Sequence, residues 1–173
     1  MPDEAYRTDS PVEDIAVKLL DKGGLVVSTA ESCTGGLLAG RIVNVPGASN
    51  VYKAGFITYS NKAKRRYLGV RKGTLKKYGA VSKQTAGEMV KGLVAETGAD
   101  VGLATTGIAG PGGGSDEKPV GLVYIGCSVC GRVRVKKFVF DGDRMRVRES
   151  AVTAALDLMI KCVEEYYTEN KSK

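Results

Sequence analysis

Two neighbouring side chains in this sequence could act as nucleophiles, although the chain contains no histidine. Ser32 and Cys33 lie in the segment AESCTGG, which follows directly on the apolar run LVVST. Without histidine, a Ser-His-Asp triad, a Cys-His pair and a histidine-ligated metal are all excluded. A proton shuttle for either nucleophile must therefore be lysine, tyrosine or a carboxylate. The spacing alone does not choose between Ser32 and Cys33.

The glycine turn behind these nucleophiles has the pattern of an anion-binding turn. A buried strand leads into the turn, and an apolar helix follows it. The backbone N–H groups of Thr34, Gly35 and Gly36 would then lie at a helix N-terminus, where they suit an oxyanion or a phosphate. A nucleophile beside such donors is the arrangement used in acyl transfer. A simple helix cap by Ser32 or Thr34 accounts for the same residues equally well.

A second segment, TYSNKAK, supplies Tyr59, Lys62 and Lys64 as candidate proton-transfer groups. A lysine base needs a lowered pKa, because at about 10.4 the side chain stays protonated at neutral pH. Partial burial and nearby positive charge both lower a lysine pKa, and Arg65 and Arg66 lie close in sequence. A solvated basic helix face is the alternative explanation for any one of these lysines.

The third segment, TTGIAGPGGGSDEKP at 105–119, is the most glycine-rich stretch of the chain. Its glycines would allow a ligand to approach the backbone closely, but a plain surface loop has the same composition. The G-x-x-x-x-G-K-[ST] pattern is absent, so nucleoside triphosphate chemistry is not supported. Four acidic residues in and after the loop could hold a metal, but no spacing requires one, and we expect solvated carboxylates at Asp116, Glu117, Asp141 and Asp143.

The CxxC pair Cys127 and Cys130 has neither a second pair nor a histidine to complete a zinc site. The pair lies in a strand-like segment, so we expect core or hairpin thiols. The four cysteines of the chain do not make a disulfide framework at this length.

Composition limits the possible partners. The 26 Lys and Arg against 19 Asp and Glu give a net charge of +7, but aromatic residues make up only 6% and tryptophan is absent. Stacking side chains for single-stranded nucleic acid are therefore scarce, and we expect no nucleic-acid binding. The N-terminus is polar and acidic, and no apolar run reaches the ~18 residues of a membrane span. We expect a cytoplasmic protein without membrane association.

Hydrophobic periodicity predicts an α/β fold with one domain. Strands are expected at 25–30, 51–59, 101–107, 120–129 and 132–140. Helices are expected at 12–23, 37–45, 61–69, 71–78, 83–97 with Ser82 as N-cap, and 144–167. This order predicts a three-layer α/β/α domain over residues 11–168, with a mixed, mostly parallel sheet of about five strands. A flexible tail at 1–10 and a polar tail at 169–173 are expected to flank it.

Five motifs at matching separations resemble the CinA C-terminal domain family: AESCTGG, GFITYSNKAKRRYLGV, GAVS, TGIAGPGGGSDEKPVG and GDRMRVR. The resemblance covers residues 12 to 165. It implies an amidohydrolase that deamidates nicotinamide mononucleotide to nicotinate mononucleotide and ammonia in pyridine nucleotide salvage, with no metal and no cofactor. Carried over by motif, Ser32 is the nucleophile, Lys64 the general base, and Tyr59 orients the proton or relays it.

The resemblance also implies the residues that bind the substrate. Thr106 and Gly107 would line the pocket near the amide, and Arg144 and Arg148 match the arginines of the last motif, either of which would contact the phosphate. The backbone of Thr34, Gly35 and Gly36 would stabilise the oxyanion. The alternative is a catalytically silent nucleotide-binding or partner module of the same fold. A homodimer or other homo-oligomer is expected, as for many small α/β enzymes.

Overall fold

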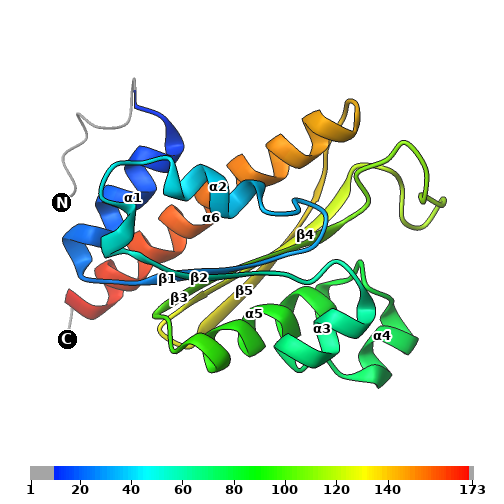
Figure 1. The fold of residues 1–173 in the computed structure, drawn as a ribbon, viewed down its shortest axis with the longest axis horizontal. Coiled ribbons are helices and arrows are strands. Elements are labelled where there is room, and N and C mark those ends of the chain that lie inside the picture. Colours follow the sequence, from blue (N-terminus) through cyan, green and yellow to red (C-terminus); the bar gives the residue numbers. More distant parts are fainter. Residues whose placement is uncertain (1–9, 172–173) are drawn as a thin grey trace.

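The computed structural model describes residues 10–171 as a five-stranded sheet between two layers of helices (Figure 1). The strand order is β2-β1-β3-β4-β5. β1 is parallel to β2 and β3, whereas β4 is antiparallel to both β3 and β5. The predicted α/β class and the mixed sheet of five strands are therefore confirmed. The strands are β1 (Val27–Glu31), β2 (Tyr52–Ile57), β3 (Val101–Gly107), β4 (Leu122–Val129) and β5 (Arg132–Val139).

Helices cover both faces of the sheet, as predicted. One layer consists of α1 (Val12–Gly23), α2 (Leu37–Val43) and α6 (Arg144–Lys171). The other consists of α3 (Asn61–Leu68), α4 (Lys72–Tyr78) and α5 (Lys83–Thr97) (Figure 1). A short 3₁₀ helix, η2 (Ala48–Asn50), precedes β2. No helix among these is long and apolar enough to cross a membrane, over the part of the chain that is described.

The predicted ends of several elements shift. β1 begins at Val27 rather than at residue 25, and α6 continues to Lys171, beyond the expected end at 167. The first residues of the expected polar tail at 169–173 thus belong to a helix. The expected N-terminal tail falls, except for Ser10, on residues outside the described range.

The central strands are buried along their whole length because helices cover them on both sides. All five residues of β1 are buried, and so are the first six of β3. Val27, Leu103 and Ile125 pack under α1, α2 and α6, whereas Ala30 and Ala104 pack under α5 and α3. The strands that end at the carboxyl edge of the parallel part are therefore fixed in position by packing on two faces.

The helix α3 begins where β2 has ended, and its cap sets which lysine points inward. Ser60 is the N-cap, and its hydroxyl accepts a hydrogen bond from the amide of Ala63 at 3.0 Å. The inward-facing residues of the helix are Lys64 and Leu68, one turn apart. Lys62 and Arg65 are exposed. Ser82 caps α5 in the same way by accepting from the amide of Thr85, which confirms the predicted cap.

Close contact between α3 and α5 depends on a glycine in the middle of α5. A methyl carbon at Gly92 would overlap the backbone carbonyl of Leu68, at the end of α3. Gly87, five residues earlier in α5, has room for a methyl group, because the nearest atom would be Val135 Cγ2 at 3.6 Å. Gly92 therefore permits the approach that holds α3, and with it Lys64, against the sheet.

We expect Gly92→Ala to lower the free energy of unfolding by about 1–3 kcal/mol, because the added carbon forces α3 and α5 apart. The matched variant Gly87→Ala should raise it by about 0.5–1 kcal/mol, since alanine favours the helix and meets no clash. Urea denaturation followed by circular dichroism measures both. Equal stabilisation by the two substitutions would contradict this account of α3–α5 packing.

Candidate active site

A pocket of about 230 Å³ lies at the carboxyl ends of β1 and β3. Its lining brings together the three segments that the sequence singled out, as the topology of a parallel sheet requires. Six predicted site residues line it, together with Cys33, Ala80, Val81 and Ala109: Ser32, Tyr59, Lys64, Thr106, Gly107 and Arg144. Four others, Thr34, Gly35, Gly36 and Arg148, lie outside its lining.

A short hydrogen-bonding contact in the pocket joins the two groups expected to react. Lys64 Nζ lies 2.8 Å from Ser32 Oγ, 2.8 Å from the carbonyl oxygen of Thr58 and 3.4 Å from that of Tyr59. Lys64 is 1% exposed and Ser32 8%. The two carbonyls can take both hydrogens of a neutral amine, which leaves its lone pair for the hydroxyl hydrogen of Ser32. The geometry is therefore that of a serine beside its base.

Burial lowers the pKa of Lys64 from its ordinary 10.5 to about 8, and the nearby Cys33 opposes this in part. Desolvation penalises the charged ammonium form, so a substantial fraction of neutral amine exists near neutral pH. The lowering was expected from the sequence, but its cause is desolvation and not the cations next to it. The side chains of Lys62, Arg65 and Arg66 are exposed, and water screens their charges.

The two alternatives that the sequence left open are separated by these environments. Burial raises the pKa of the Cys33 thiol from 9.0 to about 11, which disfavours the reactive thiolate. Ser32, in contrast, has a lysine at hydrogen-bonding distance. Lys62 lies on the exposed side of α3, away from either nucleophile. The contacts thus favour Ser32 over Cys33 and Lys64 over Lys62.

A buried carboxylate organises the turn that follows Ser32. Glu31 is 1% exposed, and its two oxygens accept hydrogen bonds from the Thr34 hydroxyl at 2.6 Å and from three backbone amides. Those amides belong to Gly36 at 2.9 Å, Leu38 at 3.1 Å and Ala39 at 2.8 Å. The carboxylate of Glu31 thereby occupies the N-terminus of α2, where the helix dipole favours a negative charge. Sequence reasoning overlooked Glu31; a glutamate inside an apolar strand, just before a glycine turn, was the available signal.

The Gly36 amide, expected to face the substrate, is thus occupied by Glu31, and the amide of Ser32 donates to the carbonyl of Thr105 at 3.0 Å. Between these two ends of the turn, the amides of Cys33, Thr34 and Gly35 donate to no other residue within residues 10–171, although the Cys33 amide is close to its own thiol. Thr34 serves the turn through its buried hydroxyl, which also bonds to the hydroxyl of Thr105 at 2.7 Å.

Arg148 holds the same turn from its other side. Its Nε donates to the carbonyl of Cys33 at 3.0 Å, and its Nη2 donates to the carbonyl of Thr34 at 2.8 Å. Arg148 therefore contacts the carbonyls of the turn at residues 32–36, which we call the nucleophile turn. The resemblance had implied that either Arg148 or Arg144 contacts a phosphate. The Arg148 guanidinium fixes the direction of the two peptide groups that follow Ser32.

The mouth of the pocket is formed by Tyr59 and Arg144. Arg144 Nη2 donates to the Tyr59 hydroxyl at 3.1 Å, and its Nη1 donates to the carbonyl of Gly110 at 2.9 Å. The phenol of Tyr59 is 63% exposed, and the contact of this residue with Lys64 runs through its backbone carbonyl. Arg144 thus links the end of β2 to the glycine-rich loop across the opening.

Thr106 and Gly107 line the pocket at the end of β3, beside the end of β1 that precedes Ser32. The Thr106 hydroxyl donates to the carbonyl of Ala80 at 2.8 Å and so joins β3 to the loop before α5. Any side chain at Gly107 would clash with the backbone of Leu122 and Val123, on β4. These two residues shape this part of the pocket, and their placement agrees with a role in lining it.

The acidic residues and the CxxC thiols lie outside the pocket and form no metal site within the described residues. The described residues contain no group of three or more His, Cys, Asp or Glu side chains that could hold a metal ion. Asp143 caps α6 by accepting from the amide of Arg146 at 2.9 Å. Cys127 is buried in β4, and Cys130, with a φ of 47°, forms the exposed turn to β5, so the CxxC pair lies in a hairpin as predicted.

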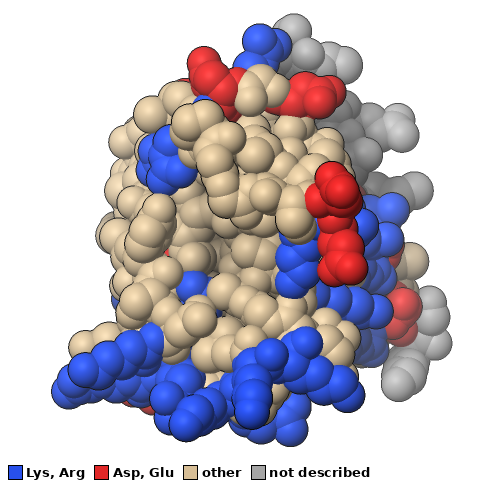
Figure 2. Space-filling view, turned by 90° about the vertical axis from the view of Figure 1, so that its right-hand side faces the viewer, with Lys and Arg blue, Asp and Glu red and all other residues tan. Residues whose placement is uncertain are grey.

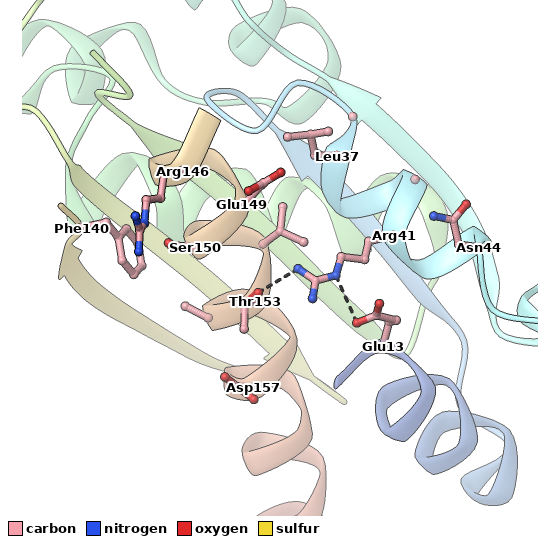
Figure 3. Close-up of a pocket in the computed structure, with 14 residues that line it drawn as sticks. Glu13, Leu37, Arg41, Asn44, Phe140, Arg146, Glu149, Ser150, Thr153 and Asp157 are labelled. Carbon is pink, nitrogen blue, oxygen red and sulfur yellow. Dashed lines mark hydrogen bonds and ion pairs between the residues drawn. The ribbon is translucent and has the colours of Figure 1, made fainter. Parts of the chain in front are cut away.

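A larger hollow of about 1030 Å³ lies between α2 and α6, in the helix layer that also contains α1. Figure 3 shows Arg41 bridging this space, with bonds to Glu13 at 3.1 Å and to Thr153 at 2.8 Å. Of the predicted site residues, only Gly36 lines it. Its size does not make it the candidate active site, because Ser32 and Lys64 both line the smaller pocket.

Known proteins are similar to this chain in both sequence and fold. The sequence model of the CinA C-terminal domain family matches residues 9–163. A putative competence-damage inducible protein of Clostridium novyi is 56% identical over 146 residues, which cover 84% of this chain and 35% of that protein. A CinA-like protein of Kosmotoga olearia is 55% identical over 151 residues, 87% of this chain and 37% of that protein. The chain thus spans little more than a third of these relatives.

Solved structures extend the similarity to three dimensions. The competence/damage inducible protein CihA from Agrobacterium tumefaciens superposes with a TM-score of 0.83 at 42% identity, covering 90% of this chain and 97% of that one. A CinA superfamily protein from Klebsiella pneumoniae gives a TM-score of 0.86 at 34% identity, covering 89% and 96%. The similarity to these structures extends over about nine-tenths of this chain.

We expect Glu31→Gln to lower the free energy of unfolding by about 1–3 kcal/mol, because an NH₂ group would replace an oxygen that accepts buried N–H and O–H donors. The matched variant Glu96→Gln changes an exposed glutamate on α5 and should stay within about 0.5 kcal/mol of the wild type. Urea denaturation compares the two. Unfolding midpoints that coincide would show that the carboxylate does not hold the turn.

Proposed function

The chain belongs to the CinA C-terminal domain family, and on that premise we propose that it is an amidohydrolase that converts nicotinamide mononucleotide and water to nicotinate mononucleotide and ammonia. The observation that carries the proposal is the 2.8 Å contact between Lys64 Nζ and Ser32 Oγ in a water-poor pocket. A desolvated lysine beside a serine supplies the base that a protein without histidine needs.

In the first half of the reaction, Ser32 Oγ attacks the carboxamide carbon while its proton moves to Lys64 Nζ. The carbonyl oxygen becomes an oxyanion, for which the amides of Cys33, Thr34 and Gly35 are the available donors. The C–N bond then breaks, and the proton held by Lys64 passes to the departing nitrogen, which leaves as ammonia. An acyl ester on Ser32 remains, and Lys64 is neutral again.

In the second half, Lys64 removes a proton from a water molecule, whose oxygen attacks the ester carbon. The same turn amides stabilise the second oxyanion. The bond to Ser32 Oγ breaks, and Lys64 returns the proton to this oxygen. The products are the free serine and the carboxylic acid of the nucleotide, which releases its proton to solvent and becomes the carboxylate. Each proton taken by Lys64 is thus given back within the same half of the reaction, and no further co-reactant is needed.

Tyr59 and Arg144 are suited to meet the part of the substrate that lies outside the pocket. A cavity of about 230 Å³ falls below the usual ~300–1,000 Å³ of a site that encloses a whole ligand. It would take the carboxamide and its ring, and it would leave the phosphate at the mouth. There Arg144 is exposed and already held in place by Tyr59 and Gly110. Arg148, committed to the turn, is the weaker choice for the phosphate.

We expect Ser32→Ala and Lys64→Met to lower kcat at least about 10³-fold, because each removes a group that takes part in bond making or proton transfer. Cys33→Ala should keep most of the activity, since the thiol is held in its unreactive form. Ammonia release from nicotinamide mononucleotide, measured with a chelator present, compares the variants. Loss of activity in Cys33→Ala with activity kept in Ser32→Ala would overturn the assignment of the nucleophile.

The same assay tests the alternative of a catalytically silent module. A folded wild type that binds nicotinamide mononucleotide without releasing ammonia would identify the chain as such a module and would contradict the proposed activity.

We expect kcat/KM to rise with pH and to level off above a pKa of about 8, because only the neutral amine of Lys64 can accept the serine proton. Below that pKa the rate should fall about tenfold for each pH unit, as a single ionisation requires. Measurement between pH 6.5 and 9.5 follows this change. The profile of Cys33→Ala should keep the single step at a somewhat lower pH, because Cys33 raises the pKa of Lys64. A rate independent of pH across this range would exclude Lys64 as the base.

A further inference from the structure

The helices α3 and α4 present a dense group of positive charges. Between residues 61 and 78 the sequence NKAKRRYLGVRKGTLKKY contains no aspartate or glutamate. Apart from Lys64, every lysine and arginine of this segment is exposed. Arg71 is neutralised by Glu88, whose carboxylate lies 2.5 Å from its guanidinium. The remaining cations, which we call the α3–α4 basic surface, are Lys62, Arg65, Arg66, Lys72, Lys76 and Lys77.

No acidic side chain among the described residues forms an ion pair with the α3–α4 basic surface. Arg66 lies over the ring of Tyr67 at 5.5 Å and Lys77 over that of Tyr78 at 5.0 Å, contacts that leave their charges in place. The net charge of the whole chain is +7. A large share of its excess positive charge is therefore concentrated on two short helices.

Residues that line the pocket stand just before α3 and just after α4 in the sequence, so the two helices are tied to the pocket at both ends. α3 starts two residues after Tyr59, and α4 is followed by Ala80 and Val81, all three of which line the pocket. Lys118 of the glycine-rich loop adds a cation here, since its Nζ donates to the carbonyl of Tyr78 at 2.6 Å. Figure 2 shows Lys and Arg side chains along the lower part of the face, below a hollow in its centre.

A phosphate at the mouth of the pocket would therefore lie in a positive potential. A phosphomonoester carries about −1.5 to −2 charges at neutral pH. Exposed charges act on it over about 10 Å at 0.1 M salt and over about 30 Å at 0.01 M. Clefts flanked by one sign of charge raise the local concentration of ligands of the opposite sign, and they increase association rates.

We infer that the α3–α4 basic surface selects substrates by charge: it draws phosphorylated, net-negative amides to the pocket and disfavours the unphosphorylated, net-positive nucleoside. The inference rests on the proposed function, because the carboxamide of the substrate must react inside the pocket while its phosphate stays at the mouth. The surface acts on capture and binding, and the Ser32–Lys64 pair acts on the chemistry.

Binding to the inert Ser32→Ala protein tests the inference apart from catalysis. The probes are nicotinamide riboside, nicotinamide mononucleotide and nicotinate mononucleotide, which share one scaffold and become more negative in that order. Titration calorimetry gives each Kd at about 0.01 M and about 1 M salt, where the Debye length is about 30 Å and 3 Å. We expect the salt to weaken the binding of nicotinate mononucleotide most and that of nicotinamide mononucleotide less, and to tighten the binding of the riboside, whose positive charge the surface repels.

A charge variant assigns this effect to the surface. Lys62→Gln, Arg65→Gln, Lys72→Gln and Lys76→Gln together should raise the Kd of nicotinamide mononucleotide on the order of fivefold at low salt. The matched control removes four exposed cations that lie away from the carboxyl edge of the parallel strands, on α1, β2 and the later parts of α5 and α6: Lys22→Gln, Lys53→Gln, Lys91→Gln and Lys161→Gln. The control should raise this Kd less than the α3–α4 variant does, because its charges lie farther from the pocket.

The outcomes separate this inference from the proposed function. Equal effects of the two charge variants, no salt dependence, or no binding of either nucleotide would overturn the charge selection. With the charge selection intact, absence of ammonia release by the wild type would instead refute the amidohydrolase activity. In active protein, the α3–α4 variant should raise KM for nicotinamide mononucleotide and leave kcat unchanged; a lower kcat with constant KM would contradict a role in capture.

Discussion

Burial of a single amine is the constraint on which the candidate site depends. Transferring a lysine out of water disfavours its charged form, and here it lowers the pKa of Lys64 to about 8. The buried nitrogen needs partners, which the carbonyls of Thr58 and Tyr59 and the hydroxyl of Ser32 provide. These partners lie at the ends of two adjacent parallel strands and can meet the amine only if α3 packs tightly. The burial of Lys64 therefore also depends on Gly92, which permits the close contact between α5 and α3.

The nucleophile turn is held by two charged groups with opposite tasks. Glu31 accepts hydrogen bonds from the amides at the start of α2, and Arg148 donates hydrogen bonds to the carbonyls of Cys33 and Thr34. Neither group takes the amides in between, so these remain the donors available to a developing oxyanion. A fixed set of unpaired amides beside a serine is costly to keep in a folded protein, and buried or half-buried charges on both sides are one way to enforce it.

The sequence predicted the fold better than it predicted the roles at the site. Among the described residues, periodicity and glycine turns identified each strand and each α-helix, because the 3.6- and 2-residue patterns record which faces are buried, but they did not identify the short 3₁₀ helix η2. Motif spacing brought Ser32, Lys64 and Thr106 to one edge of the sheet. It could not show that Glu31 fills the N-terminus of α2, or that Arg148 binds backbone carbonyls, because both contacts depend on how α2 and α6 pack. A charged side chain near an anion-binding pattern can serve the ligand or the turn, and only the three-dimensional contacts distinguish these uses.

The helix α3 shows how one short segment can hold cations with two different functions. Its inward face carries Lys64, which gives up its proton more readily because burial lowers its pKa; its outward face carries Lys62, Arg65 and Arg66, which are solvated. If desolvation were weaker, Lys64 would be one more cation of the basic surface and could not accept a proton. If the outer cations were buried, their charge would have to be paired or lost. The helical repeat thus separates a lysine of lowered pKa from a charged surface within eight residues, so the proposed chemistry and the proposed capture of an anionic substrate can change independently.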